Sequence, residues 1–441
     1  MTLGVLAASG FSGVALAEGI DGAATAWMLV STALVLLMTP ALAFFYGGLV
    51  RSKNALNTMM MSFAALGFVG VGWALLGYSL AFAQGSPWLG SLEHLFLKGV
   101  SLEAKGEIPH LLFMAFQGTF AIITAALLTG ALVERMRFAP LLLFLSLWGL
   151  FVYAPIAHWV WGGGFLGTLG ALDFAGGTVV HINAGVAALV GALVLGARKD
   201  YGLQAILPHS VPLTLLGAAL LWFGWFGFNG GSALSSGTLA SLAFVNTLLA
   251  PAATLVVWTL LDLLRTGKAT AVGLATAIVV GLVAVTPAAG FVSPLSALVL
   301  GGVAALPSYF FLLYRPRTRL DDSLDVFGAH GIAGITGALL TGLLAEKAWN
   351  GVTDGLLFGN ARQLAIQALA VGVALGFSAL GTFLLLKLTG LFTPLRASPK
   401  EEGLGLDVTQ HGEEAYASGE GAILVLSEAS PKALKPVGGE A

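Results

Sequence analysis

Cysteine is absent from this chain of 441 residues. Its absence excludes disulfide bonds, thiol catalysis and metal sites built from cysteine. Charge is also scarce, because Asp, Glu, Lys and Arg together make up only 10% of the residues, whereas soluble globular domains have about 25%. The basic residues form no stripe of the kind that binds nucleic acid, so we expect no nucleic-acid partner.

What the chain has instead is apolar sequence, since 57% of its residues are hydrophobic. A helix needs about 20 consecutive apolar residues to cross a bilayer. Segments of roughly that length recur along the whole chain and predict an all-α integral membrane protein with eleven transmembrane helices, near residues 24–50, 54–83, 110–133, 139–160, 176–197, 212–231, 240–264, 269–289, 295–314, 325–345 and 363–390.

The distribution of basic residues predicts the orientation of these helices. All but four of the 20 Lys and Arg residues lie in alternate connections or at the C-terminal end. The exceptions are Lys98, Lys105, Lys347 and Arg362. Because Lys and Arg concentrate in cytoplasmic loops, we expect the N-terminus outside and the C-terminus in the cytoplasm. An odd number of spans satisfies this arrangement.

The sequence divides into three parts. Residues 1–17 are predicted to be a signal peptide or an N-terminal extension, because Ala15-Leu16-Ala17 resembles a cleavage site although a basic n-region is missing. Residues 18–390 are predicted to be the transmembrane domain, and residues 391–441 a polar cytoplasmic tail. We expect a multi-pass protein of the inner (plasma) membrane.

Two histidines lie well inside predicted spans, His181 in the fifth and His330 in the tenth. Ionisable groups inside a membrane are costly and mark functional sites. Their matched positions predict a five-plus-five inverted repeat with one extra helix, the plan of transport proteins whose site lies between the repeats. Alone, each histidine could be an ordinary packing residue with satisfied hydrogen bonds, but the pair favours function.

An aspartate precedes each histidine. Asp173 is predicted to cap the fifth span, and it could also place negative charge near the entrance for a cation. For Asp325, at the start of the tenth span, capping alone is a sufficient explanation. The pair of histidines has no third ligand at a readable spacing, so we expect neither a metal nor a cofactor.

Aromatic residues near these spans are less specific. Trp161 stands where tryptophan belts are normal, and it could instead form a cation–π wall. Phe120 and Phe228 could plug a pore, although periodicity alone favours packing.

The motifs resemble those of the ammonium transporter (Amt/MEP/Rh) family, and in particular its bacterial ammonium-channel branch. The resemblance extends from about residue 22 to Tyr416. It is carried by residues 173–181 (DFAGGTVVH), 116–120 (FQGTF), 224–229 (GWFGFN) and 325–331 (DVFGAHG).

The resemblance implies a role for each matching residue. Phe120, Trp161 and Ser232 would recruit ammonium at an outer vestibule, with Asp173 acting beside it through structure and charge. Phe120 and Phe228 would form a gate, with Trp225 next to it. His181 and His330 would line the conduction path.

The resemblance also implies partners. The family forms homotrimers with one pore in each subunit. Residues 401–407 and 411–416 look like the cytoplasmic tail that contacts PII-type signalling proteins in nitrogen metabolism, with Leu404-Gly405 as an apparent small insertion.

The expected function is therefore transport of ammonium or ammonia across the membrane. A cation in a dry passage bears a high desolvation cost. Ammonium can give up a proton and cross as ammonia, with the proton following or staying behind, whereas potassium has no proton to lose. The alternatives are an ammonium sensor that signals through its tail and a Rhesus-type gas channel. An enzyme is not expected, because no nucleophile–base set or cofactor motif is present.

Overall fold

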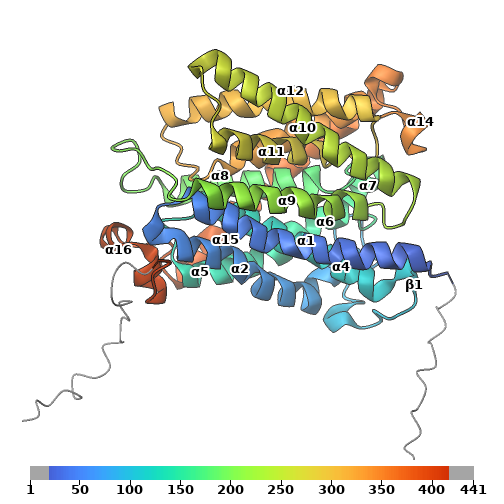
Figure 1. Cartoon of the computed structure of the whole chain (residues 1–441). Coiled ribbons are helices and arrows are strands. Elements are labelled where there is room, and N and C mark those ends of the chain that lie inside the picture. Colours follow the sequence, from blue (N-terminus) through green and yellow to red (C-terminus); the bar gives the residue numbers. More distant parts are fainter. Residues whose placement is uncertain (1–18, 417–441) are drawn as a thin grey trace, which may run out of the picture.

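The computed structural model describes residues 19–416, and its predominant architecture is a bundle of long helices that run side by side (Figure 1). The helices that make up the bundle are α1 (Gly22–Leu49), α2 (Ala55–Gly72), α3 (Tyr78–Phe82), α4 (His110–Leu128), α5 (Phe138–Trp148), α6 (Ala154–Val160), α8 (Asn183–Leu195), α9 (Val211–Gly231), α10 (Thr238–Thr266), α11 (Ala271–Val285), α12 (Pro294–Tyr314), α13 (Ala333–Leu344) and α15 (Ala361–Phe392).

Short elements lie at the two ends of the bundle. Helix α16 (Pro399–Leu404) and a turn at Asp407–His411 lie at one end, here called the tail face. Helices α7 (Phe165–Leu169) and α14 (Lys347–Asn350) and the hairpin of β1 (Ala104–Lys105) and β2 (Ile108–Pro109) lie at the other end, here called the opposite face. Helix α1 starts at the opposite face, and the described residues end with Tyr416 on the tail face.

Several helices include π-helical turns, in which each N–H reaches one residue further back along the chain. Such turns are rare and concentrate at functional sites. In the described part of the chain, two of them carry the predicted site histidines: Gly177–Ile182 leads into α8, and Phe327–Ile332 leads into α13. The others are Trp73–Gly77, Gly149–Tyr153 and Asp407–His411.

Small residues bring the helices into close contact, as they do where no hydrophobic effect drives association. At the α1–α9 interface, an added Cβ on Gly217 would lie 2.3 Å from the backbone nitrogen of Phe45, and one on Gly224 would lie 2.4 Å from Met38. Large apolar side chains are exposed around the outside of the bundle, Leu193, Leu264 and Leu380 among them. This surface suits contact with lipid.

The predicted spans agree with these helices to within a few residues. Ten helices of the described residues are long and apolar enough to cross a membrane. The segment predicted at 269–289 is α11, an apolar helix of 15 residues, which is shorter than the usual span. An eleventh crossing there stays a prediction. The predicted signal peptide and the last part of the predicted tail lie outside the described residues.

Buried ion pairs join the connections at the tail face. Arg198 bonds Glu134 at 2.6 Å and Asp321 at 2.8 Å, and Arg51 bonds Glu134 at 3.0 Å. Burial alone would raise the pKa of Glu134, but these two arginines hold it below its usual value. A buried pair of this kind is costly to break, because the remaining partner is left uncompensated. The network therefore fixes the connections on which the tail rests.

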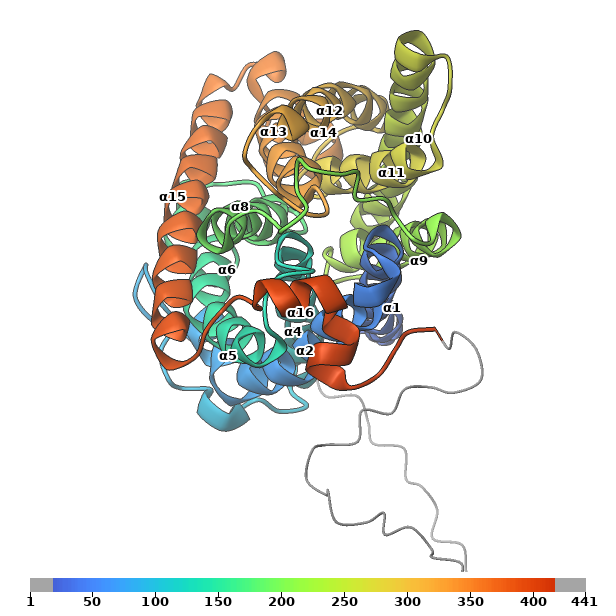
Figure 2. The same ribbon diagram turned by 90° about the vertical axis from the view of Figure 1, so that its left-hand side faces the viewer.

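The tail lies across this end of the bundle, with α16 in front in Figure 2, and hydrogen bonds attach it to the network. Asn54 donates its side-chain amide to Glu134 and accepts the backbone N–H of Leu406. Asp407 accepts the backbone N–H groups of Leu56 and Asn57 at 3.0 and 2.7 Å. Gly405, in the segment noted above as an apparent insertion, has a φ of +113° and packs against Lys53. The tail is thus an ordered part of the fold as far as Tyr416.

Candidate functional site

The two histidines face one another in the interior of the bundle. The Nδ1 atoms of His181 and His330 are 3.2 Å apart, and their rings stack with centroids 5.4 Å apart. Both side chains are buried. Each ring lies on one of the two π-helical turns, and these turns are about 150 residues apart in the chain. The fold thus brings together the two residues that the sequence singled out.

Asp173 holds the turn that carries His181. One of its carboxylate oxygens accepts the backbone N–H of Gly176 at 3.0 Å, and the other accepts those of Thr178 and Val179 at 2.9 and 3.0 Å. The predicted capping role is therefore present. Both oxygens are occupied by the backbone, so in this structure Asp173 acts on the site by holding its neighbours.

The corresponding residue before His330 is Asp322, and the capping role predicted for Asp325 is wrong. Asp322 accepts the backbone N–H of Phe327 at 2.7 Å, at the start of the second π-helical turn. Asp325 has a φ of +58° and pairs instead with Arg315. Burial raises the pKa of Asp322 to about 6. The sequence did contain the signal: Asp322 precedes His330 by eight residues, as Asp173 precedes His181.

A narrow cavity surrounds the histidine pair. Its volume is about 10 Å³, close to the minimum that holds one water molecule. Apart from the two histidines, its lining is apolar or aromatic: Met38, Leu42, Phe45, Ile123, Leu127, Val180, Leu221, Trp225, Phe228 and Val279. A solute here would find only the imidazole nitrogens as strong polar partners. Nε2 of His181 is buried without a hydrogen-bond partner among the described residues.

Two stacked phenylalanines close the narrow cavity toward the opposite face. The ring centroids of Phe120 and Phe228 are 4.2 Å apart with an interplanar angle of 28°. Trp225 stacks on His181 at 5.3 Å and donates its indole N–H to Thr286 at 2.9 Å. The rings thus form a continuous aromatic and imidazole stack, which fixes the orientation of the histidines.

A wider cavity of about 300 Å³ lies beyond the phenylalanine pair. Phe120, Trp161 and Ser232 line it, together with Phe82, Phe113, Gln117, Val160, Phe174 and Leu234. The rings of Phe120 and Trp161 meet edge to face at 5.9 Å, and Trp161 donates its indole N–H to the backbone oxygen of Asp173 at 2.8 Å. Ser232 donates to the backbone oxygen of Phe228, which leaves its oxygen available as an acceptor.

Gln117 was not identified from the sequence as a site residue. Its side-chain oxygen is buried and has no hydrogen-bond partner among the described residues, although Gln117 lines the wider cavity. A buried unpaired acceptor usually has a specific role. The available signal was an isolated amide in the apolar helix α4, one turn before Phe120.

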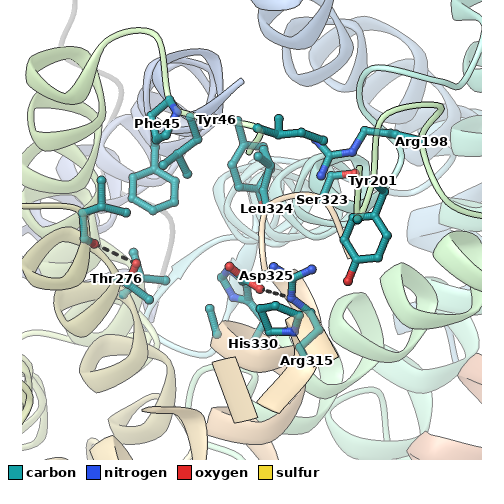
Figure 3. Close-up of a pocket in the computed structure, with 18 of the residues that line it drawn as sticks. Phe45, Tyr46, Arg198, Tyr201, Thr276, Arg315, Ser323, Leu324, Asp325 and His330 are labelled. Carbon is teal, nitrogen blue, oxygen red and sulfur yellow. Dashed lines mark hydrogen bonds and ion pairs between the residues drawn. The ribbon is translucent and has the colours of Figure 1, made fainter. Parts of the chain in front are cut away.

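A third cavity opens toward the tail face (Figure 3). Its volume is about 420 Å³, and it is lined by polar groups that include Arg198, Tyr201, Arg315 and Asp325. Figure 3 shows the Arg315–Asp325 ion pair beside His330. His330 lines both this cavity and the narrow one.

The three cavities therefore follow one another through the bundle: a wide aromatic cavity, a phenylalanine closure, a narrow passage at two histidines and a polar cavity. A passage this narrow and apolar, in helices of membrane length, defines a membrane protein that conducts a small solute.

Comparison with known proteins identifies the family. The model of the Ammonium Transporter Family matches residues 26–416. An ammonium transporter of Bacillus subtilis is 49% identical over 397 residues, which cover 89% of this chain and 98% of that protein. The crystal structure of Mep2 from Saccharomyces cerevisiae is similar with a TM-score of 0.82 and 37% identity, over 87% of this chain and 89% of that one.

A structure described as a Sensor Amt Protein is also similar, with a TM-score of 0.82 and 30% identity over 88% of this chain and 98% of that one. The chain belongs to the ammonium transporter family. The resemblance inferred from the sequence motifs is thereby confirmed, and so is the expectation of a multi-pass membrane protein.

Proposed function

We propose that this protein transports ammonium across the plasma membrane by conducting ammonia through the histidine-lined passage. The observation that carries the proposal is the narrow cavity at His181 and His330, which is apolar except for the imidazoles and has room for one small molecule. The family membership supports ammonium as the solute, since the Bacillus subtilis relative is named an ammonium transporter.

Recruitment takes place in the wide cavity. A cation over an aromatic face gains electrostatic attraction, and Phe120 and Trp161 present faces and edges there beside the Ser232 oxygen. The unpaired Gln117 oxygen adds a second acceptor. Asp173 stabilises this site without lining it. Its carboxylate accepts three backbone N–H groups, and its backbone oxygen accepts the indole N–H of Trp161.

Selectivity follows from the dryness of the passage. An ion that entered the narrow passage with its charge would lose its hydration without gaining a charged partner, which costs several kcal/mol or more. Ammonium avoids this cost by giving up a proton. Ammonia then passes the Phe120–Phe228 gate and hydrogen-bonds to the histidine pair, whereas potassium is excluded. The proton crosses separately from ammonia, and the histidine pair is the candidate relay for it.

The membrane arrangement is proposed as eleven spans in two inverted halves plus α15, with α11 as the eighth span. The opposite face is then external and the tail face cytoplasmic, in agreement with the position of most basic residues. The matched histidine turns, each held by an aspartate eight residues earlier, support the repeat. We further propose a homotrimer and a PII-type partner at the ordered tail.

Ammonium-induced current in proteoliposomes tests the function. Intact protein should give a current that saturates with ammonium and is absent with potassium. His181→Ala and His330→Ala should lose this discrimination, because the added space admits water and hydrated ions. His209→Ala is the matched control, since His209 contacts Val50 and Tyr416 at the tail face.

No ammonium-dependent flux or current in the intact protein would overturn the proposal and favour the sensor alternative. Unchanged selectivity in both histidine variants would reduce the histidines to packing residues. Saturable flux of uncharged ammonia alone would favour the Rhesus-type gas channel.

A further inference from the structure

A lysine ammonium lies on an aromatic ring at the edge of the wide cavity. The Nζ atom of Lys105, on strand β1, is 4.8 Å from the ring centroid of Phe113 and 5.7 Å from that of Tyr78. Both distances are within the range of cation–π attraction. Lys105 makes no ion pair with any residue between 19 and 416. The ammonium therefore contacts the aromatic face without a direct ion pair, and the charge of Glu93 acts on it only at longer range.

Hydrogen bonds hold the lysine in this position. Lys105 donates to the Tyr78 hydroxyl at 3.3 Å, and that hydroxyl lies 2.6 Å from Nε2 of His110. Since Lys can only donate, the hydroxyl accepts a hydrogen bond from Lys105. With His110 neutral, the hydroxyl in turn donates a hydrogen bond to Nε2 of that ring. His94 closes the group, with its ring 5.1 Å from that of His110. Burial lowers the pKa of Lys105.

Helix α4 connects this lysine to the proposed recruitment site. His110, Phe113, Gln117 and Phe120 follow one another at spacings of three or four residues, so they share one face of the helix. Phe113, Gln117 and Phe120 line the wide cavity, whereas Lys105 does not. Lys105 thus acts on the cavity across the Phe113 ring. From Phe113 to Phe120 is seven residues, or about 10 Å along the helix.

We propose that Lys105 sets the affinity of the outer vestibule for ammonium by opposing the arrival of a second cation. The inference rests on the proposed function, because it takes the wide cavity as the recruitment site. The observation behind it is that the Lys105 ammonium contacts the ring of Phe113, which lines that cavity. The lysine is the same chemical group as the solute and occupies an aromatic face next to those that would bind it.

Two physical effects act in the same direction. We take the rise of about 10 Å from Phe113 to Phe120 as the separation of the two charges. At that separation, two unit charges repel enough to weaken binding about two- to fourfold if the effective dielectric constant is between about 40 and about 80. In addition, an aromatic face occupied by one cation offers less to a second cation nearby. Both effects disappear with the lysine charge, and the first also decreases with added salt.

The test measures the half-saturating ammonium concentration of the current in proteoliposomes at one external pH. Lys105→Met removes the charge and keeps the apolar stem, and Lys105→Gln is a second neutral variant in case the methionine protein does not fold. Lys105→Arg keeps the charge. Lys98→Met is the matched control, because Lys98 is an exposed lysine of the same connection without a ring contact in the structure.

We expect the half-saturating concentration to fall about two- to fourfold in the neutral variants at low salt, with a smaller difference at about 1 M salt, where the screening length is roughly 3 Å. Lys105→Arg and Lys98→Met should match the intact protein. An unchanged or raised value in the neutral variants would overturn the inference, as would an equal shift in Lys98→Met or Lys105→Arg. Absence of saturable current in the intact protein would overturn the proposed function itself.

Discussion

Nδ1 of His181 lies 3.2 Å from Nδ1 of His330. Two nitrogens at that distance share a hydrogen bond only if one carries a proton and the other does not. The rings must then differ in tautomer or in charge, although they occupy matched positions in the sequence. Because one ring donates and the other accepts, the two sides of the histidine pair are not equivalent.

The first prediction concerns this asymmetry. Nitrogen NMR of histidine-labelled protein in lipid should show one of the two buried rings with a protonated Nδ1 and the other with a bare Nδ1. His330→Ala should remove one set of signals and release the constraint on the other. Identical Nδ1 protonation in both rings would contradict the shared hydrogen bond.

The second prediction compares the two capping aspartates. Both carboxylate oxygens of Asp173 accept backbone N–H groups. In Asp173→Asn the side-chain NH2 replaces one of these oxygens and would point a donor at a backbone N–H. We therefore expect a loss of about 1–3 kcal/mol in the free energy of unfolding. Asp322 uses one oxygen for Phe327, and its other oxygen is buried without a partner among residues 19–416. Asp322→Asn keeps an oxygen for that single bond and should therefore destabilise the protein less than Asp173→Asn does.

Thermal unfolding in detergent measures both changes. Asp322→Ala is the control for the cap itself and should cost about 1 kcal/mol. Equal effects of asparagine at the two positions would show that charge, and not the number of accepted hydrogen bonds, decides the outcome.

The helices and the histidine pair could be predicted from the sequence because their signals are local. Apolar runs of membrane length gave the spans, and two ionisable residues in those runs gave the site. The choice of Asp325 as a cap failed because it relied on proximity to the start of the span. Its positive φ and its pairing with Arg315 depend on how α12 meets the next segment, which no local pattern reports.

The wide cavity shows the same limit. Phe113 and Gln117 read as ordinary members of an apolar helix, and only the packing of α4 against the 161–174 and 228–234 segments exposes them to one space. The contact of Lys105 with Phe113 likewise depends on the fold of the β1–β2 hairpin. Charge and aromatic content were visible in the sequence, but their juxtaposition was not.

The third prediction concerns Gln117. Gln117→Leu removes an acceptor from the wide cavity, so the half-saturating ammonium concentration should rise about tenfold or more, because a hydrogen bond to a charged group is worth about 1.5–3 kcal/mol. Gln117→Glu should lower it, because it adds negative charge at the same place. Currents in proteoliposomes give both values. A shift in the same direction for both variants would indicate a change of shape and not of hydrogen bonding.

The last prediction is that tail docking weakens as the pH at the tail face falls. Nε2 of His411 lies 2.9 Å from the side-chain nitrogen of Asn57, and it accepts from that amide only while the ring is neutral. Burial lowers the pKa of His411 from 6.5 in the docked tail. The stabilisation is therefore present above about pH 6.5 and is lost as pH falls below it, at up to about 1.4 kcal/mol per pH unit.

Asp407 titrates with the opposite sign. Burial raises its pKa from 3.8, so protonation of Asp407 favours docking, but its usual pKa is well below that of histidine. His411 therefore dominates when pH falls from 7.5 toward 6. Because the chain has no cysteine, Lys400→Cys gives a unique site for a spin label, whose mobile fraction reports release of the tail. We expect that fraction to rise on acidification, and to stay constant in His411→Gln, which cannot titrate. An equal rise in both proteins would assign the pH dependence to another group.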